Sequence, residues 1–442
     1  MKEKNQQPSE MVVGIQGIQW AVFMLTNIVA VPVVVGAAFH MSPADISTFM
    51  QRMLFVTGAA TLVQVFFGHR LPIVEGGAGM WWALFILLGA MSAPTERGQL
   101  LQQLELGLVS AGIFLVILSF LPIIGKIRNL FTPIVTGVYL LLLVSQMSGS
   151  FFKSMLGVTA TGHLDGRIAA ISFIEVFIIL MISLRATGIW RSMGPLIGIA
   201  AGWILFQIVG LNPSAKAFTP SGWFVFPKIF SWGTPQFDFG IVLTSVITGI
   251  VLISNVIASI LVIGMAIQKE IQPIEHQRGI FGNGISLTLS GLFSVVGVIP
   301  LSVAGGFIST TGIKEKKPFI IGAIIILVTG FFPYIGGFFS TMPLEVAYAS
   351  LFIPFAQMLG FGIRDLMGQE PSNRNLLVIG LSLMVGIGMM FMPPVAFESV
   401  APWLRNMIAN GLLVGLILCL LLEHVLFPAK KPKKVERNQS NS

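Results

Sequence analysis

The 442-residue sequence has few charged side chains. Only 10% of its residues are Asp, Glu, Lys or Arg, whereas 55% are hydrophobic. A soluble protein carries about 25% charged residues, so a water-soluble globule is excluded. The mean hydropathy is +0.88, and apolar stretches of about 20 residues, the length that crosses a bilayer core, recur along the whole chain. We therefore expect an all-α, multi-pass protein of the plasma membrane.

Cysteine and histidine are also scarce. The chain contains one cysteine, Cys419, and five histidines, which excludes disulfides and cysteine metal sites. The histidines form no cluster with metal-ligand spacing. Phosphate-loop, catalytic-triad and dinucleotide motifs are absent, so we expect neither an enzyme nor a cofactor. The N-terminal residues MKEKNQQPSEM lack the features of a signal peptide, and the first apolar span is expected to direct insertion.

Hydropathy divides the chain into about fourteen spans, of which the third and tenth are short and interrupted. The expected ranges are 15–36, 48–67, 73–91, 104–122, 131–147, 168–186, 194–211, 239–265, 279–297, 304–313, 318–336, 343–360, 376–393 and 403–427.

Positive charge predicts the topology. If both termini face the cytoplasm, 19 of the 26 Lys and Arg residues fall in cytoplasmic segments, as the positive-inside rule requires. The net charge of +8 is therefore a signal of topology, and we expect no nucleic-acid partner. The basic C-terminal stretch KKPKKVER is expected to contact anionic lipid headgroups of the bilayer.

The first half of the sequence resembles the second. LTNIVAVPVVVG (25–36) aligns with ISNVIASILVIG (253–264), and RLPIVEGG (70–77) aligns with VIPLSVAGG (298–306), both at an offset of 228. Three shorter matches follow in the same order. Seven spans are an odd number, so the second unit would enter the membrane from the opposite side, as in the inverted repeats of secondary transporters. The predicted units are residues 1–228 and 229–428, followed by a cytoplasmic tail, 429–442.

The stretch GVIPLSVAGGFISTTG in span ten places Pro300, a glycine pair and several hydroxyls inside an apolar run. Non-helical backbone is tolerated at membrane depth only where it is buried in protein or lines a cavity. Spans three and ten are each predicted to form a short strand and then a half-helix, starting near Gly76 and Gly305. Their N–H groups would point at the membrane centre, which suits a small, flat, acceptor-rich or anionic molecule. Helix packing through small residues is the alternative reading.

Several strings resemble the nucleobase–ascorbate transporter family (nucleobase:cation symporters of the second kind) in a divergent, purine- or uracil-permease-like form. They are GIQWAVFMLTNIVAVP in span one, the break of span three, FGNGISLTLSGLF in span nine and NGLLVG in the last span. The family signature in span ten is kept at Gly306, Thr311 and Gly312, but its polar head is replaced by Val303 and Ala304.

Two further departures concern the residues that bind substrate in this family. Asn255 and Ser259 stand where the family has a glutamate and a histidine, and Gln19-Trp20 replaces a Gln-His pair. Both family carboxylates are therefore missing. The only acid in an interrupted span is Glu75, and a membrane acid marks a functional site by default. Capping its own helix, or pairing with Arg70 or His69, is the alternative role for Glu75.

The resemblance implies a secondary active transporter that imports a nucleobase by alternating access, with proton symport as the default and sodium coupling or uncoupled transport as alternatives. It also implies a core domain (spans 1–4 and 8–11), a gate domain (spans 5–7 and 12–14) and a homodimer. The expected substrate-binding residues are Glu75, Gly77, Ala78, Gly79, Met80, Trp81, Asn255, Ser259, Ser302, Val303, Ala304, Gly305 and Gly306, with Glu75 also the coupling candidate.

Other polar residues receive structural interpretations. Asn27, the repeat mate of Asn255, is expected to bridge helices, and Glu175 and Glu345 are expected to pair at helix ends or between helices. Trp82 shares with Trp81 the prediction of a ring-stacking face. The alternative function is an anion transporter or channel of the same fold, since sulfate and bicarbonate carriers share this architecture.

Overall fold

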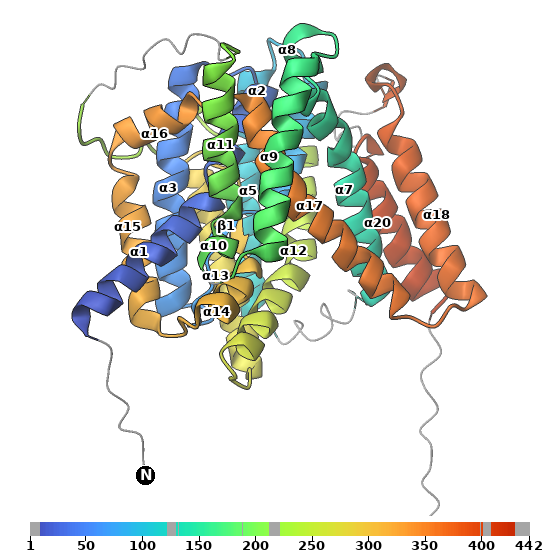
Figure 1. The fold of residues 1–442 in the computed structure, drawn as a ribbon. Coiled ribbons are helices and arrows are strands. Elements are labelled where there is room, and N and C mark those ends of the chain that lie inside the picture. The colour runs from blue at the N-terminus through green and yellow to red at the C-terminus, as the bar shows by residue number, and fades with distance from the viewer. Residues whose placement is uncertain are drawn as a thin grey trace, which may run out of the picture.

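The computed structural model describes residues 9–121, 130, 132–187, 189–211, 222–397, 399–400 and 408–428. In these ranges the chain forms a bundle of α-helices with two short strands near its centre (Figure 1). The predicted cytoplasmic tail lies outside the described residues.

Several helices of the first half, among them α1, α3, α7 and α9, start after a residue whose side chain caps them. α3 begins at Pro43, after a capping box in which Ser42 Oγ accepts a hydrogen bond from Asp45 N at 3.2 Å. The elements are α1 (Glu10–Thr26), α2 (Ala30–Ala38), α3 (Pro43–Phe66), β1 (Glu75–Gly77), α4 (Gly79–Met91), α5 (Arg97–Ser119), α7 (Pro133–Met155), α8 (Val158–Thr161), α9 (Gly166–Arg185), α10 (Ile189–Ser192) and α11 (Gly194–Ile208).

The second half follows the same chemistry. The carboxylate of Asp238 accepts a hydrogen bond from Ile241 N at 2.8 Å and so caps α12. The elements are α12 (Phe239–Ala266), α13 (Pro273–Leu292), β2 (Val298–Pro300), α14 (Val303–Thr311), α15 (Lys316–Thr329), α16 (Pro333–Ser340), α17 (Leu344–Met367), α18 (Asn373–Met390), the 3-10 turn η1 (Pro394–Phe397), α20 (Gly411–Leu421) and the π-helical turn η2 (Leu422–Leu426).

Eight helices of the described part, with α1 and α2 taken as one, are long and apolar enough to cross a bilayer. The pair α15 and α16, bent by 83°, would make a ninth. Because such helices run from one end of the described chain to the other, this is a multi-pass membrane protein. Helical segments lie at or near every predicted range, but α4, α11 and α20 are shorter. The total of fourteen crossings and the inversion of the two halves stay predictions.

The helices pack in two groups (Figure 1). The α3–α13 group contains α1 to α5 and α12 to α16, with α5 against α13 and α1 against α15. The α7–α17 group contains α7 to α11, α17, α18 and α20, with α17 against α7 and α18 against α20. Contacts between the groups run mainly from α2 to α17, from α4 to α7 and from α10 to α14.

Glycines bring α5 and α13 into backbone contact. A Cβ atom on Gly112 would lie 2.5 Å from the carbonyl oxygen of Gly284, and one on Gly284 would lie 2.7 Å from the carbonyl oxygen of Gly112. Gly291 makes a similar approach to the backbone of Glu105. Small residues at membrane helix interfaces permit this close packing, so α5 and α13 are held together along much of their length.

We predict that Gly284→Val destabilises the protein, because the added side chain meets backbone that cannot move aside. Overpacking of this kind costs about 1–3 kcal/mol or more. The measurement is the thermal melting midpoint of the detergent-solubilised protein. The matched control is Gly380→Val in α18, where a Cβ atom would meet nothing within 4 Å. Equal midpoints for the two variants would contradict the close contact of α5 and α13.

Candidate functional site

Two strands meet at the centre of the α3–α13 group. β1 and β2 pair antiparallel, with Glu75 opposite Pro300 and Gly77 opposite Val298. The pairing continues at both ends, because Ala78 N donates to Gly297 O at 3.1 Å and Leu301 N donates to Val74 O at 2.8 Å. Each strand therefore satisfies the backbone groups of the other, which membrane-buried non-helical chain requires. The predicted strand in each interrupted span is confirmed.

A helix follows each strand almost at once. α4 begins at Gly79 and α14 at Val303, not at Gly76 and Gly305 as the sequence predicts. Neither helix has a side-chain cap. In α14, Ala304 N and Gly305 N donate to the carbonyl oxygens of Leu301 and Ser302, so the N–H groups left for other acceptors are those of the first turn of α4 and that of Val303. The predicted register of the halves is also wrong here, since β2 begins 223 residues after β1 and not 228. Pro300 lies within its strand, whereas Pro72 precedes β1.

α12 contributes two polar side chains that bond the strand pair. Ser259 Oγ donates to the carbonyl oxygen of Pro300 at 2.9 Å, and Asn255 Nδ2 donates to the same oxygen at 3.4 Å. The Oδ1 atom of Asn255 is left to accept a hydrogen bond from another group. Ser254 instead donates to its own helix, at Val251 O. Asn255 and Ser259 thus lie beside the break of span ten, and their part in substrate binding stays a prediction.

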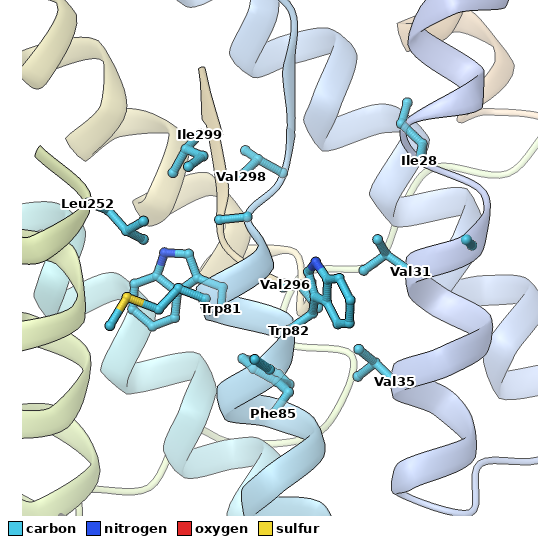
Figure 2. Close-up of a cluster of buried hydrophobic side chains, with 14 of the residues drawn as sticks. Ile28, Val31, Val35, Trp81, Trp82, Phe85, Leu252, Val296, Val298 and Ile299 are labelled. Atoms are coloured by element: carbon cyan, nitrogen blue, oxygen red, sulfur yellow. The ribbon is translucent and has the colours of Figure 1, made fainter. Parts of the chain in front are cut away.

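The two tryptophans of α4 point in different directions (Figure 2). Trp81 is directed toward Leu252 of α12. Its ring also packs on Gly297, where an added Cβ atom would lie 2.6–2.7 Å from the nearest ring atoms. Trp82 lies toward Val31 and Val35 of α2 (Figure 2). Trp82 also contacts α17, with ring centroids 4.9 Å apart from Phe355. Trp82 therefore lies where the two helix groups meet.

The glycines of the predicted site have different surroundings. A Cβ atom on Gly79 would face Phe355, Leu143 and Met358 at 3.5–3.8 Å, so the start of α4 faces the α7–α17 group. Gly305 is packed against α12, with a Cβ position 2.6 Å from Val262 Cγ1. Helix packing therefore requires a small residue here, and the predicted approach of a ligand to Gly305 stays a prediction. Gly306 would meet nothing within 4 Å.

The other predicted residues divide by exposure. Ala78, Met80 and Ala304 are buried, whereas Val303 is 46% exposed. Ser302 occupies the cap position of α14, but its hydroxyl makes no capping hydrogen bond.

Glu75 is completely buried, and neither carboxylate oxygen has a hydrogen-bond partner. Its backbone N donates to Thr61 Oγ1 of α3 at 3.2 Å. The alternative roles considered for Glu75 are not seen, because Ala78 occupies the cap position of α4 and no described ion pair joins Glu75 to Arg70 or His69. The carboxyl group is therefore held at the strand pair without a basic partner.

α13 presents a row of polar side chains that the sequence analysis did not single out. Asn283, Ser286 and Ser290 follow one another at helical spacing on one face and are all fully buried. Ser290 Oγ accepts a hydrogen bond from Val298 N of β2 at 3.3 Å, and the Ser286 hydroxyl is directed toward Glu75. The signal was present in the string FGNGISLTLSGLF, whose polar residues recur every three or four positions.

The interpretations of Asn27 and Glu175 need correction, and the surroundings of Trp20 can be added. Asn27 does not bridge helices, since its Nδ2 donates to Phe23 O of its own helix. Trp20, at the position of the family histidine, is fully buried in an aromatic cluster, with ring centroids 4.3 Å from Phe307 of α14. Glu175 has no hydrogen-bond partner and packs against Gly202 of α11. Glu345 does lie in the first turn of α17.

Among the described residues, no group of three or more His, Cys, Asp and Glu side chains could hold a metal ion.

The sequence from 12 to 395 matches the model of the permease family that is named for xanthine and uracil permeases. The chain belongs to this family. The permease is 33% identical over 407 residues to YwdJ of Bacillus subtilis, which is named as a purine permease, covering 90% of this chain and 92% of that protein. It is 25% identical to the uric acid permease PucJ and 25% identical to the xanthine permease, both of Bacillus subtilis, covering 94% or more of each chain. Family members are transporters, in agreement with the expectation of a non-enzymatic protein.

The permease also shares its fold with solved structures. The transmembrane domain of the cyanobacterial bicarbonate transporter BicA superposes with a TM-score of 0.62 at 15% identity, covering 86% of this chain and 97% of that one. The inward-facing murine anion transporter Slc26a9 gives a TM-score of 0.64 at 11% identity, covering 95% of this chain and 69% of that one. At such identities the likeness shows the fold alone.

We predict that Gly305→Leu lowers the melting midpoint of the permease and abolishes its transport, because the side chain would enter the space of Val262 and push α14 away from α12. Gly306→Leu is the matched control and should melt like wild type, since its Cβ position is open. Thermal melting in detergent separates the variants. A Gly305→Leu protein as stable as wild type would contradict the contact between α14 and α12.

Proposed function

We propose that this permease is a secondary active transporter that imports a nucleobase of the xanthine, hypoxanthine, urate or uracil class across the plasma membrane by proton symport. Both termini would be cytoplasmic, and the protein would act as a homodimer. Alternating access would move the predicted core domain, which corresponds to the α3–α13 group, against the predicted gate domain, which corresponds to the α7–α17 group.

One observation carries the proposal: a member of this permease family has two uncapped helix N-termini that start from one strand pair beside Asn255. Helix N-termini carry partial positive charge and free N–H donors. Broken helices that meet in this way form substrate sites in secondary transporters. The carbonyl oxygens of a purine or pyrimidine base would accept hydrogen bonds from these N–H groups.

The side chains around the strand pair suit the ring N–H groups and the flat faces of a base. Asn255 Oδ1 would accept a ring N–H group, because its Nδ2 is already engaged with Pro300 O. Trp82 and Phe355 present aromatic rings at the start of α4, and flat heterocycles stack on such rings. A nucleobase offers both features, a planar ring and alternating donors and acceptors on its edge.

Glu75 is the proposed carrier of the coupling proton. The family carboxylates of spans eight and ten are missing here, and Glu75 is the one acid at the strand pair. An ionised carboxylate is costly to bury without a partner. Proton uptake from one side of the membrane and release on the other would give Glu75 a neutral and a charged state, which alternating access could couple to substrate movement.

The anion-transport alternative has less support. It rests on the fold shared with BicA and Slc26a9 at 15% and 11% identity, whereas the family match and the relatives named above are nucleobase permeases.

We expect cells that lack their own permeases to take up labelled xanthine, hypoxanthine, urate or uracil when they express this chain, and to lose accumulation when a protonophore is added. If accumulation survives the protonophore but requires sodium, the coupling ion is sodium and not the proton. No uptake of any of the four bases by well-expressed, correctly inserted protein would contradict the proposed function.

We further predict that Asn255→Ala raises the apparent KM for the base about tenfold, the effect of losing one buried hydrogen bond of about 1.4 kcal/mol. Asn27→Ala is the matched control. Because Asn27 bonds its own helix, its loss should leave KM unchanged. Initial uptake rates over a range of base concentrations give both values, and an unchanged KM for Asn255→Ala would remove Asn255 from the site.

A further inference from the structure

Glu75 lies against different helices from those that hold the proposed base site. Side chains alternate along a strand, so Glu75 and Gly77 share one face of β1. A Cβ atom on Gly77 would lie 3.1 Å from Met53 of α3, and Glu75 N bonds Thr61 of the same helix. Asn255, by contrast, approaches the strand pair from α12. The carboxyl group of Glu75 is therefore on the side of α3 and α13.

Polar side chains without partners lie on the two helices that contact the strand pair on this side, α3 and α13. Ser286 lies beside the Glu75 carboxyl group, although no hydrogen bond of ordinary geometry joins them. Asn283 lies one turn before Ser286 on the same face of α13, and both its side-chain polar atoms are unpartnered. Thr57, one turn before Thr61 on α3, has an unpartnered hydroxyl. Glu75, Asn283, Ser286 and Thr57 are all fully buried.

In the part of the chain that the structure describes, no basic side chain forms an ion pair with Glu75. Around Glu75, α3 contributes hydroxyls and the amide of Gln64, which is bonded to Gly279 O at 3.1 Å, and α13 contributes Asn283 and Ser286. The titratable neighbour is His69, packed against Gly279, whose Nδ1 accepts from Leu71 N at 3.0 Å. Arg52 of α3 is engaged elsewhere, with Ser231 and Ser294.

Buried polar groups of native proteins are almost always hydrogen-bonded, and each exception calls for an explanation. Four such side chains, one of them a carboxylate, lie on β1, α3 and α13, and a bound cation would satisfy their oxygen atoms. We infer that Glu75, Asn283 and Ser286 form the site of the coupling cation, a site separate from the base pocket. This inference rests on the proposed function and adds Asn283 and Ser286 to the coupling role of Glu75, which would bind the cation and not the base.

A proton would bind as follows. It forms an O–H bond with one oxygen of Glu75, and this O–H donates to Asn283 Oδ1 or Ser286 Oγ. Loss of the proton to water on the other side restores the carboxylate. Asn283 and Ser286 are positioning residues, because they act by stabilising the protonated carboxyl group. Sodium would instead be coordinated by the same oxygen atoms. The test therefore applies a pH gradient and a sodium gradient separately.

The experiment compares two transport modes in proteoliposomes that contain the purified permease. Accumulation of labelled base is driven by an imposed pH gradient or an imposed sodium gradient. Counterflow exchange of base for base needs neither gradient. The variants are Glu75→Gln, which mimics the protonated state, Asn283→Ala and Ser286→Ala. The controls are Asn255→Ala, from the base pocket, and Glu175→Gln, an equally buried carboxyl group in the α7–α17 group.

We expect Glu75→Gln to keep counterflow with an unchanged KM and to lose gradient-driven accumulation. Asn283→Ala and Ser286→Ala should move the pH at which accumulation is half-maximal and leave the counterflow KM alone. Asn255→Ala should raise the KM about tenfold in both modes, and Glu175→Gln should behave like wild type. Loss of counterflow, or a raised counterflow KM, in well-folded Glu75→Gln protein would place Glu75 in the base pocket and overturn the inference.

The sodium arm and a substrate-free assay separate this inference from the proposed function. Accumulation driven by sodium and lost in Glu75→Gln would support the site and replace the proton of the proposed function. If wild type transports no base, melting midpoints are measured over a range of pH and with sodium or choline chloride. A pH or sodium dependence that disappears in both Glu75→Gln and Asn283→Ala would support the site. The same dependence in wild type and both variants would overturn it.

Discussion

The structure depends on how backbone hydrogen bonds are satisfied where helices are interrupted inside the membrane. An unpaired N–H or C=O group in hydrocarbon costs several kcal/mol. β1 and β2 avoid this cost by pairing with each other, while Ser290 of α13 and Ser259 of α12 bond the backbone of β2. The break in the first half of the chain is thus stable only because the second half supplies its partner. This mutual dependence holds the starts of α4 and α14 in one place, where helix N-termini can act on a ligand.

The same arrangement separates two kinds of polar group around the strand pair. Asn255 reaches it from α12 and keeps an acceptor atom free. Glu75 projects toward α3 and α13, among unpartnered oxygens. A transporter that couples two solutes needs two sites that share one moving element, since each ligand can then shift the same conformational equilibrium. β1 carries Glu75 and leads directly into α4, so it is an element of that kind.

Much of the fold and part of the site could be predicted from the sequence. Long apolar runs gave the helices because bilayer thickness fixes their length, and the Pro and Gly residues of spans three and ten located the strand pair. The start of α4 was missed because Ala78, which precedes it, is not a capping residue type. Ser302 before α14 is one, but the prediction followed the glycine pair instead. The packing role of Gly305 depends on Val262, which lies far away in sequence. Asn283 and Ser286 were missed because helical spacing shows which residues share a face but not what that face contacts.

The contact between Trp82 and Phe355 has a mechanical consequence. It joins the two helix groups through rings whose centroids are 4.9 Å apart, and such a ring pair contributes about 0.5–1.5 kcal/mol beyond the area it buries. The contact is made by aromatic rings, so the groups could slide past each other without breaking a hydrogen bond at this point. Resistance to movement at this contact would then come from the packing of the two rings and not from hydrogen bonds. Side-chain size at these two positions would then govern the speed of the transport cycle more than its energetics.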